Sequence, residues 1–240
     1  MVSKYVDNDG VRLHVIDNER DGAGVPVLTV PGMGEEAEEY AWQLDALGDR
    51  RVVVVDVRGR GESDAPEHGY RWEDHYGDVL AALAASGLDR PIAMAYSRGS
   101  PYAFGAALHA PTPMRGLVIN DYQARHIGLG PPVYDNLRQQ KMRGRTIGER
   151  MPLHAIKGVV DESEEISLWE RIPDLRCPML VLRGGQPGSM VDDAAAARYE
   201  ESGVRVVTLP ERGHGLWYRD VDAYLAVLLP FLTEIDAATP

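Results

Sequence analysis

The fold is decided by the stretch IAMAYSRGS at residues 92–100. Its first half is an apolar run that predicts a buried strand, and it passes directly into a helix-like stretch that ends near His109. Ser97 stands at the joint. The residues two before and two after it are Ala95 and Gly99, and a sharp strand-to-helix turn requires small residues at these positions. Backbone N–H groups at the start of the helix favour negative charge beside Ser97, which is therefore a candidate nucleophile.

Short apolar runs on both sides of this stretch alternate with stretches of helical period. The expected strands cover residues 25–30, 51–56, 91–96, 114–120, 178–183 and 204–209. The expected helices cover residues 36–47, 72–85, 98–109, 192–201 and 221–235. A hairpin at residues 2–16, around a turn that ends in Gly10, precedes them. The alternation predicts an α/β fold with a mostly parallel sheet and helices on both faces.

Residues 122–176 interrupt the alternation. We expect them to form a short helical lid over the carboxyl edge of the sheet, inserted within a single domain of residues 1–240. The insertion carries a basic patch, formed by Lys141, Arg143 and Arg145. This patch could attract an anionic carrier or a carboxylate, but a solvated helix face is the favoured interpretation.

Composition limits the partners of the chain. Its net charge is −12 and it has no basic block, which argues against nucleic acid, and it has no apolar run of the roughly 20 residues that a membrane span needs. Because the N-terminal stretch also lacks the pattern of a secretory leader, a cytoplasmic location is expected. Cys177 is the only cysteine, which excludes an internal disulfide, and we interpret it as a small buried hydrophobe.

Three more motifs accompany the serine pentad, in a fixed order along the chain: VPGMG at residues 30–34, DVRGRGES at residues 56–63 and GHG at residues 213–215. Together these motifs resemble the α/β-hydrolase superfamily over nearly the whole chain. The resemblance implies an α/β-hydrolase fold with Ser97 as the nucleophile and His214 as its general base.

The same resemblance implies an oxyanion hole made by the backbone N–H groups of Met33 and Arg98. Pro31 replaces the usual His of the oxyanion loop, but main-chain donors need no particular side chain. We assign the segment RGRG at residues 58–61 to a scaffold loop, because its glycines suit a tight turn.

Only one of the seven histidines, His214, follows a predicted strand in a loop of small residues. The other six are interpreted as surface or packing residues, with His75 on a polar helix face beside Asp74 and Asp78. They are His14, His68, His75, His109, His126 and His154. Of these, His126 and His154 lie in the lid and keep a possible contact with substrate.

The acid of the triad is missing from its usual place. The loop after the strand at residues 178–183 reads GGQPGSMV, at residues 184–191, and contains no carboxylate. Asp121 ends a neighbouring strand, and some α/β-hydrolases resemble this arrangement by carrying their acid there. Asp192 or Asp193 is an alternative, although Ser189 to Asp192 also resembles a capping box that would direct Asp192 at its own backbone. A site without any acid is the third possibility.

The leading functional hypothesis is hydrolysis of an ester, thioester or lactone of a small organic acid through an acyl-enzyme on Ser97. One alternative is a cofactor-free lyase or cyclase that uses Ser97 and His214 for proton transfer, which a missing acid would favour. Another is a ligand-binding relative with low turnover. Epoxide hydrolases and dehalogenases are disfavoured, because in the superfamily they carry Asp where this chain has Ser97. No metal-ligand motif is present, so we expect no cofactor and no metal.

The expected partner is a small-molecule substrate, free or bound to a carrier. Candidate pocket residues are Gly32, Tyr96, Tyr122 and Trp217, and core packing is the alternative for most of them. The sequence determines neither the substrate nor the oligomeric state.

Overall fold

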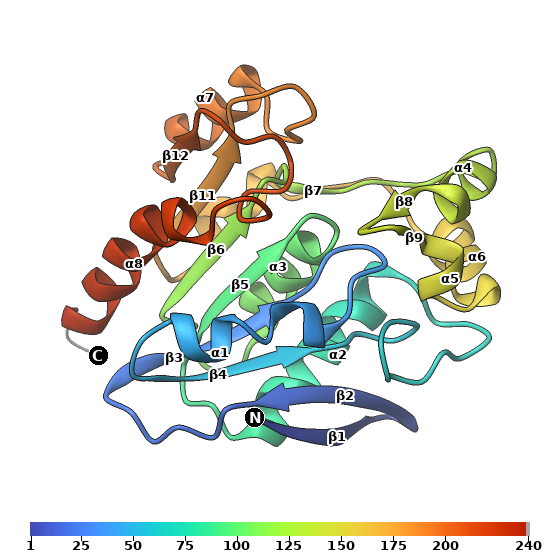
Figure 1. Ribbon diagram of the computed structural model, residues 1–240, viewed down its shortest axis with the longest axis horizontal. Coiled ribbons are helices and arrows are strands. Elements are labelled where there is room, and N and C mark those ends of the chain that lie inside the picture. The colour runs from blue at the N-terminus through green and yellow to red at the C-terminus, as the bar shows by residue number, and fades with distance from the viewer. Residues whose placement is uncertain (239–240) are drawn as a thin grey trace.

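A computed structural model of the protein describes residues 1–238. At its centre lies an eight-stranded sheet in the order β1-β2-β4-β3-β5-β6-β11-β12 (Figure 1). The strands of this sheet are β1 (Val2–Asn8), β2 (Val11–Asp17), β3 (Gly24–Val30), β4 (Arg50–Val55), β5 (Ile92–Tyr96), β6 (Gly116–Asn120), β11 (Met179–Gly184) and β12 (Arg205–Leu209). The β1–β2 hairpin and the β2–β4 pair are antiparallel, and all other pairs are parallel. The predicted mostly parallel sheet is confirmed.

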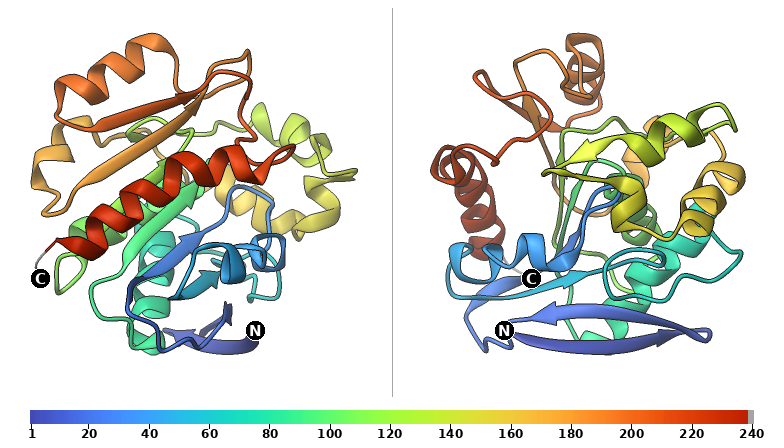
Figure 2. Two further views of the ribbon diagram at one scale, coloured as in Figure 1. Left: turned by 60° about the vertical axis from the view of Figure 1, so that its left-hand side comes forward. Right: turned by 45° about the vertical axis from the view of Figure 1, so that its right-hand side comes forward.

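Helices cover both faces of the sheet, as the alternation of elements predicts. One face packs against α2 (Trp72–Ser86), α3 (Gly99–His109) and α7 (Asp193–Glu201), and the other packs against α1 (Gln43–Ala46) and α8 (Val221–Ala237). Figure 2 shows α8 crossing its face of the sheet. Successive strand residues alternate between the two cores, because strand side chains point to opposite faces. Within residues 1–238, no helix combines the length and the apolar composition needed to span a bilayer.

The helix expected at residues 36–47 is wrong as a single element. The structure has a 3-10 turn, η1 (Ala37–Tyr40), followed by the short helix α1. The Ala37 N–H donates to Oδ1 of Asp56 at 2.7 Å, and the Tyr40 hydroxyl donates to Glu35. These hydrogen bonds fix the orientation of the 3-10 turn, so the chain does not continue as one helix into α1. The helical period of the sequence does not reveal them.

Residues 122–176 lie between β6 and β11 and form short helices, one small hairpin and a second short strand pair that joins the two ends of the segment. Their elements are β7 (Arg125–His126), α4 (Val133–Gln139), β8 (Lys141–Met142), β9 (Arg145–Thr146), α5 (Ile147–Arg150), α6 (Leu153–Glu162), β10 (Ile166–Ser167) and η2 (Trp169–Asp174). A separate apolar cluster, which includes Ile147, Met151 and Ile156 together with Tyr70, holds this lid segment. Met33 packs against the same cluster, so the lid segment reaches the loop after β3.

Candidate active site

Ser97 occupies the turn between β5 and α3 in a conformation that few residues adopt. Its φ is 49°, in the left-handed region. The turn is held by backbone bonds, from the Ser97 N–H to Asn120 O at 3.2 Å and from the Ser100 N–H to Ser97 O at 2.9 Å. A Cβ at Gly99 would lie 2.3 Å from the carbonyl oxygen of Pro31. The small residue predicted at this position is therefore required by close packing of the turn against the loop after β3.

The structure brings together three residues that are far apart in the sequence. The Ser97 Oγ lies 2.9 Å from Nε2 of His214, and Nδ1 of His214 lies 2.8 Å from Oδ2 of Asp121. The ring of Tyr96 stacks on the imidazole with the ring centroids 4.8 Å apart. Of the acid candidates, Asp121 is the one beside His214, whereas Asp192 caps α7 by accepting the Ala195 N–H at 2.7 Å.

Asp121 is fully buried and receives hydrogen bonds from the loop that lacks a carboxylate. The donors are the Gly184 N–H at 3.2 Å, the Ser189 hydroxyl at 2.5 Å and the Met190 N–H at 3.0 Å. These bonds fix the orientation of the carboxylate toward His214. The capping box considered from Ser189 to Asp192 does not form, because Asp192 itself is the N-cap and the Ser189 hydroxyl is directed to Asp121, but Asp192 is directed at its own helix as expected.

The predicted backbone donors of the oxyanion hole flank the serine. Among residues 1–238, neither the Met33 N–H nor the Arg98 N–H has a hydrogen-bond partner, and both residues line the same cavity as Ser97. The neighbouring Gly32 N–H instead donates to Oε2 of Glu35 at 3.1 Å. Two free N–H groups beside a half-buried serine hydroxyl form an arrangement that can stabilise an oxyanion.

Glu35 is a buried carboxylate that sequence reasoning missed. Besides the Gly32 N–H, it accepts hydrogen bonds from the hydroxyls of Tyr40 and Tyr218, the latter at 2.6 Å. Burial, followed by the charge of Glu35, raises the pKa of Tyr218 to about 12. Tyr218 follows His214 by four residues, so Glu35 ties the oxyanion loop to the histidine loop. No local motif marks this contact, because its partners lie more than a hundred residues apart.

The basic patch of the lid segment is largely neutralised in the fold. Arg143 lies 3.1 Å from Glu39, and Arg145 lies 3.8 Å from Glu36, both at the start of η1. Both arginines stay exposed, as the favoured interpretation expected, but they lie at the β8–β9 hairpin rather than on a helix. Lys141 is exposed.

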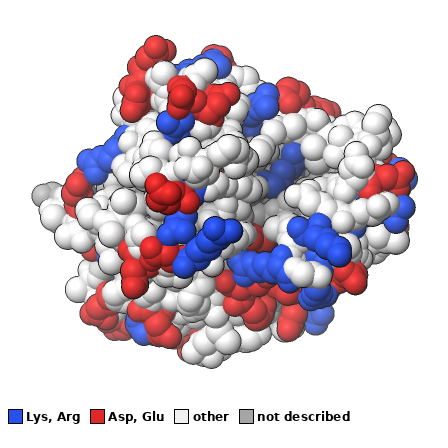
Figure 3. Space-filling model, turned by 45° about the horizontal axis from the view of Figure 1, so that its top comes forward, with Lys and Arg blue, Asp and Glu red and all other residues white. Residues whose placement is uncertain are grey.

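A cavity of about 260 Å³ opens above Ser97. Its lining is mostly apolar and consists of Met33, Tyr96, Ser97, Arg98, Tyr122, Ile127, Leu129, Leu137, Gln140, Met142, Ile147, Met190 and His214. Seen in space-filling form, this side of the molecule has a hollow with Lys and Arg side chains along its rim (Figure 3). The lining includes residues of the segment between β6 and β11, so the lid segment forms part of the wall.

Two of the four predicted pocket residues, Tyr96 and Tyr122, line this cavity. The other two do not. Gly32 lies behind the serine, where a Cβ would approach that of Ser97 to 3.2 Å. Trp217 is buried in the core against Tyr40 and Tyr224. Its indole is part of the apolar core that packs α1 and α8 on the sheet, which was the alternative for this residue.

The surface position expected for His75 is wrong. It does not lie on a polar helix face but is fully buried, with its ring stacked on Tyr102 at 4.2 Å between centroids. His126 is buried too, and its Nε2 accepts a hydrogen bond from Nη2 of Arg98 at 2.9 Å. His154 lies 2.9 Å from the carbonyl oxygen of Ala65, outside the cavity lining.

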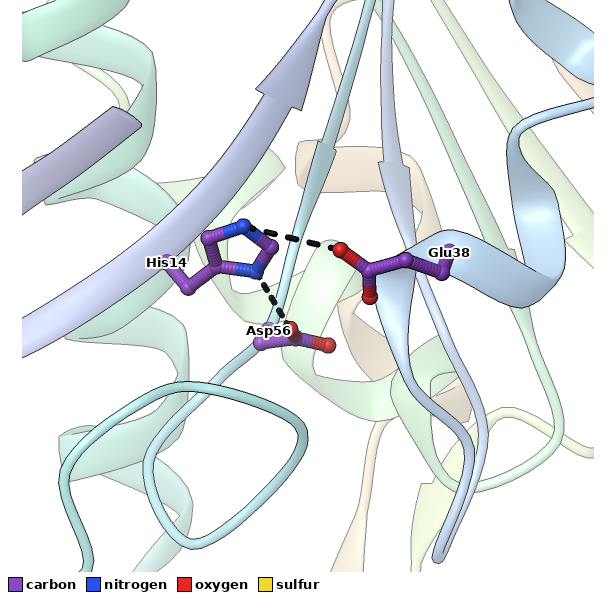
Figure 4. A group of neighbouring side chains, drawn as sticks. All are labelled: His14, Glu38 and Asp56. Carbon is purple, nitrogen blue, oxygen red and sulfur yellow. Dashed lines mark hydrogen bonds and ion pairs between the residues drawn. The ribbon is translucent and has the colours of Figure 1, made fainter. Parts of the chain in front are cut away.

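A second cluster of titratable groups lies away from the cavity, at the outer part of the sheet (Figure 4). His14 Nδ1 lies 2.8 Å from Oδ2 of Asp56, and His14 Nε2 lies 3.7 Å from Oε1 of Glu38. Asp56 also accepts the Ala37 N–H, and Ser3 Oγ lies 2.9 Å from His14 Nε2. Protein hydrogen bonds thus occupy most of these atoms, and the cluster joins β2, β4 and η1.

A mostly parallel sheet that presents a serine, a histidine and a buried carboxylate at its carboxyl edge defines the α/β-hydrolase class. The sequence profile described as "alpha/beta hydrolase fold" matches residues 25–144. The N-formylmaleamate deformylase of Pseudomonas putida is 26% identical over 256 residues, which cover 95% of this chain and 95% of the deformylase.

Solved structures of two other proteins share the fold. An enol-lactonase from Burkholderia xenovorans superposes with a TM-score of 0.78 at 22% identity, covering 96% of this chain and 100% of the lactonase. An esterase from Exiguobacterium antarcticum gives a TM-score of 0.79 at 18% identity, covering 97% of this chain and 100% of the esterase. This chain belongs to the α/β-hydrolase family, and the predictions of that fold and of an enzyme of that class are confirmed.

Proposed function

We propose that the protein is a serine hydrolase that cleaves a small acyl compound through an acyl-enzyme on Ser97. The observation that carries the proposal is the continuous contact from Ser97 Oγ to His214 at 2.9 Å and from His214 to Asp121 at 2.8 Å. In this arrangement His214 accepts the serine proton as the carbonyl is attacked, and Asp121 holds the imidazole and stabilises its charged form.

The acyl-enzyme forms in two steps, and His214 carries the proton in both. Ser97 Oγ bonds to the carbonyl carbon while its proton passes to His214 Nε2, and the Met33 and Arg98 N–H groups stabilise the oxyanion. His214 then gives the proton to the leaving oxygen, sulfur or nitrogen as that bond breaks. A water molecule attacks the acyl-enzyme by the same route and releases the acid.

The cavity size supports a small substrate. A volume of about 260 Å³ suits a compound of few heavy atoms rather than a long acyl chain. Esters, thioesters and lactones remain the proposed classes, and the relative that acts as an N-formylmaleamate deformylase adds activated N-acyl compounds to them. The lyase or cyclase alternative was favoured by a missing acid, and the position of Asp121 beside His214 takes that support away.

Labelling with a fluorophosphonate tests the proposal directly. We expect intact-mass spectrometry to find one adduct on the wild type and none on Ser97→Ala. Ser100→Ala is the matched control, because Ser100 lies three residues on, with a buried hydroxyl that has no partner among residues 1–238. It should still be labelled. An equal adduct on Ser97→Ala would rule out Ser97 as the nucleophile.

A further inference from the structure

Four arginines are buried among the residues that the structure describes: Arg50, Arg58, Arg60 and Arg98. Arg50 pairs with Asp236 at 2.9 Å, and Arg58 pairs with Asp78 at 2.7 Å. Within residues 1–238, no carboxylate forms an ion pair with Arg60 or Arg98. A buried cation without an anion is costly, since its lost hydration is not replaced by an opposite charge. Of the four buried arginines, only Arg60 and Arg98 carry this energetic cost.

The guanidinium of Arg98 has only neutral partners. Its Nη1 donates to the carbonyl oxygen of Ile127 at 2.6 Å and its Nη2 to His126 at 2.9 Å, with a longer contact from Nε to the Tyr102 hydroxyl at 3.4 Å. The Tyr122 hydroxyl is a further neutral partner of this guanidinium. A guanidinium has five N–H donors, so one N–H is left over after these four contacts. Arg98 lines the cavity above Ser97.

Arg60 has still fewer partners. Its Nη1 donates to the carbonyl oxygen of Arg58 at 3.0 Å, and its Nη2 contacts Sδ of Met33 at 3.7 Å. Met33 lines the same cavity as Arg98, and both guanidinium groups contact Tyr102, because Cζ of Arg60 lies 5.6 Å from the Tyr102 ring centroid.

The neighbouring histidines add no negative charge and are themselves kept neutral. Burial, followed by the charge of Arg98, lowers the pKa of His126 to about 3. Burial, followed by the charge of Arg60, lowers the pKa of His75 well below its ordinary value. One of the two unpaired charges, that of Arg98, thus lies in the wall of the cavity, and the other, that of Arg60, lies behind Met33, in a protein whose net charge is −12.

We propose that Arg60 and Arg98 form a subsite for a carboxylate of the substrate. The compound hydrolysed at Ser97 then carries a free carboxylate in addition to its scissile acyl bond. The unused N–H of Arg98 in the cavity wall binds that carboxylate, and the positive charge of Arg60 behind Met33 strengthens the pairing. A planar guanidinium matches carboxylate geometry, and a low-dielectric wall strengthens the pairing. This inference rests on the proposed function of Ser97.

Two esters of similar length test the subsite: 4-nitrophenyl butyrate, which is neutral, and 4-nitrophenyl hemisuccinate, which is anionic. We expect the wild type to favour the anionic ester in kcat/KM. Arg60→Gln should lower the ratio of anionic to neutral kcat/KM by about 10-fold, mainly through KM, because it removes a buried positive charge beside the subsite. Arg50→Gln is the control, because Arg50 is equally buried but lies at the opposite end of the sheet, and its ratio should not change.

A ratio that stays the same in Arg60→Gln, or a wild type without preference for the anionic ester, would overturn the subsite. If Arg60→Gln does not fold, or if neither ester is turned over, ligand binding decides instead. Succinate should raise the Tm of Ser97→Ala more than succinamide does, and equal shifts would refute the proposal. These outcomes are separate from the proposed function, which fails if Ser97→Ala hydrolyses the esters as fast as the wild type.

Discussion

The Ser189 hydroxyl donates a hydrogen bond to Oδ1 of Asp121 at 2.5 Å, while Oδ2 of the same carboxylate lies 2.8 Å from His214. Ser189 belongs to the loop after β11, where the superfamily usually carries its acid. In this chain that loop holds no carboxylate and instead donates to one at the end of the neighbouring strand β6. The carboxylate group therefore reaches nearly the same place from a different strand.

Replacing Asp121 by Asn should lower kcat by about 10⁴, because the amide favours the wrong imidazole tautomer and does not stabilise the charged ring. Steady-state kinetics with an activated ester would measure this change. Asp192→Asn is the matched control, since it removes a helix-capping charge and should cost at most about 1 kcal/mol of unfolding free energy without loss of kcat. The opposite pattern would assign the acid to Asp192.

The nucleophile turn and the histidine loop could be predicted from sequence because each depends on local chemistry. Ser97 needs small residues on both sides, and His214 stands between two glycines. Asp121 could be proposed as the acid but could not be chosen over Asp192. That choice depends on which loop donates hydrogen bonds to the Asp121 carboxylate. The hydrogen bonds of Glu35 and the unpaired charge of Arg60 could not be predicted from the sequence, because both follow from contacts between distant segments.

Replacing His214 by Ala should abolish ester turnover and leave the fold intact, because the imidazole is part-exposed in a loop and its two ring nitrogens contact Ser97 and Asp121. Kinetics together with circular dichroism and a thermal melt would check both halves of this prediction. His154→Ala serves as the control, since His154 lies outside the cavity lining and should keep full activity. Retained turnover in His214→Ala would exclude it as the general base.

His14 should make stability depend on pH. Burial lowers the pKa of His14, but its hydrogen bond to Asp56 and the charge of Asp56 outweigh burial, so the pKa is raised above the ordinary value. A raised folded pKa means that the charged ring stabilises the fold fully below the unfolded pKa of about 6.5, and that this contribution is lost as pH rises through the folded pKa.

Urea unfolding at pH values from about 5.5 to about 9 would measure this effect. We expect the difference in unfolding free energy between wild type and His14→Gln to be largest at the acidic end and to shrink as pH rises. His109→Gln is a control on another element, where Tyr76 stacks on the ring and no carboxylate is bonded to it among residues 1–238. A difference that grows with pH would mean that Asp56 does not hold the charged form of His14.

Gly99→Ala should cost both stability and activity, and the reason is backbone contact. The new Cβ would lie 2.3 Å from the carbonyl oxygen of Pro31 and 2.5 Å from that of Val30, and neither oxygen can move without shifting the loop that carries Met33. Overpacking of this kind typically costs about 1–3 kcal/mol. The shift would also move the Met33 N–H away from the oxyanion position, and one such donor is worth about 10²–10³ in kcat.

The matched substitution is Gly77→Ala in the middle of α2. Its Cβ would meet nothing closer than Nδ2 of Asn8 at 3.6 Å, so the added methyl fits, and alanine in a helix interior stabilises by about 0.5–1 kcal/mol relative to glycine. Thermal melts and ester kinetics on the two variants should therefore diverge: Gly77→Ala should melt higher with unchanged kcat, and Gly99→Ala should melt lower with a large loss of kcat. If Gly99→Ala kept wild-type kcat, the close contact between the serine turn and the loop after β3 would not position the oxyanion hole, and Met33 would lose its assigned role.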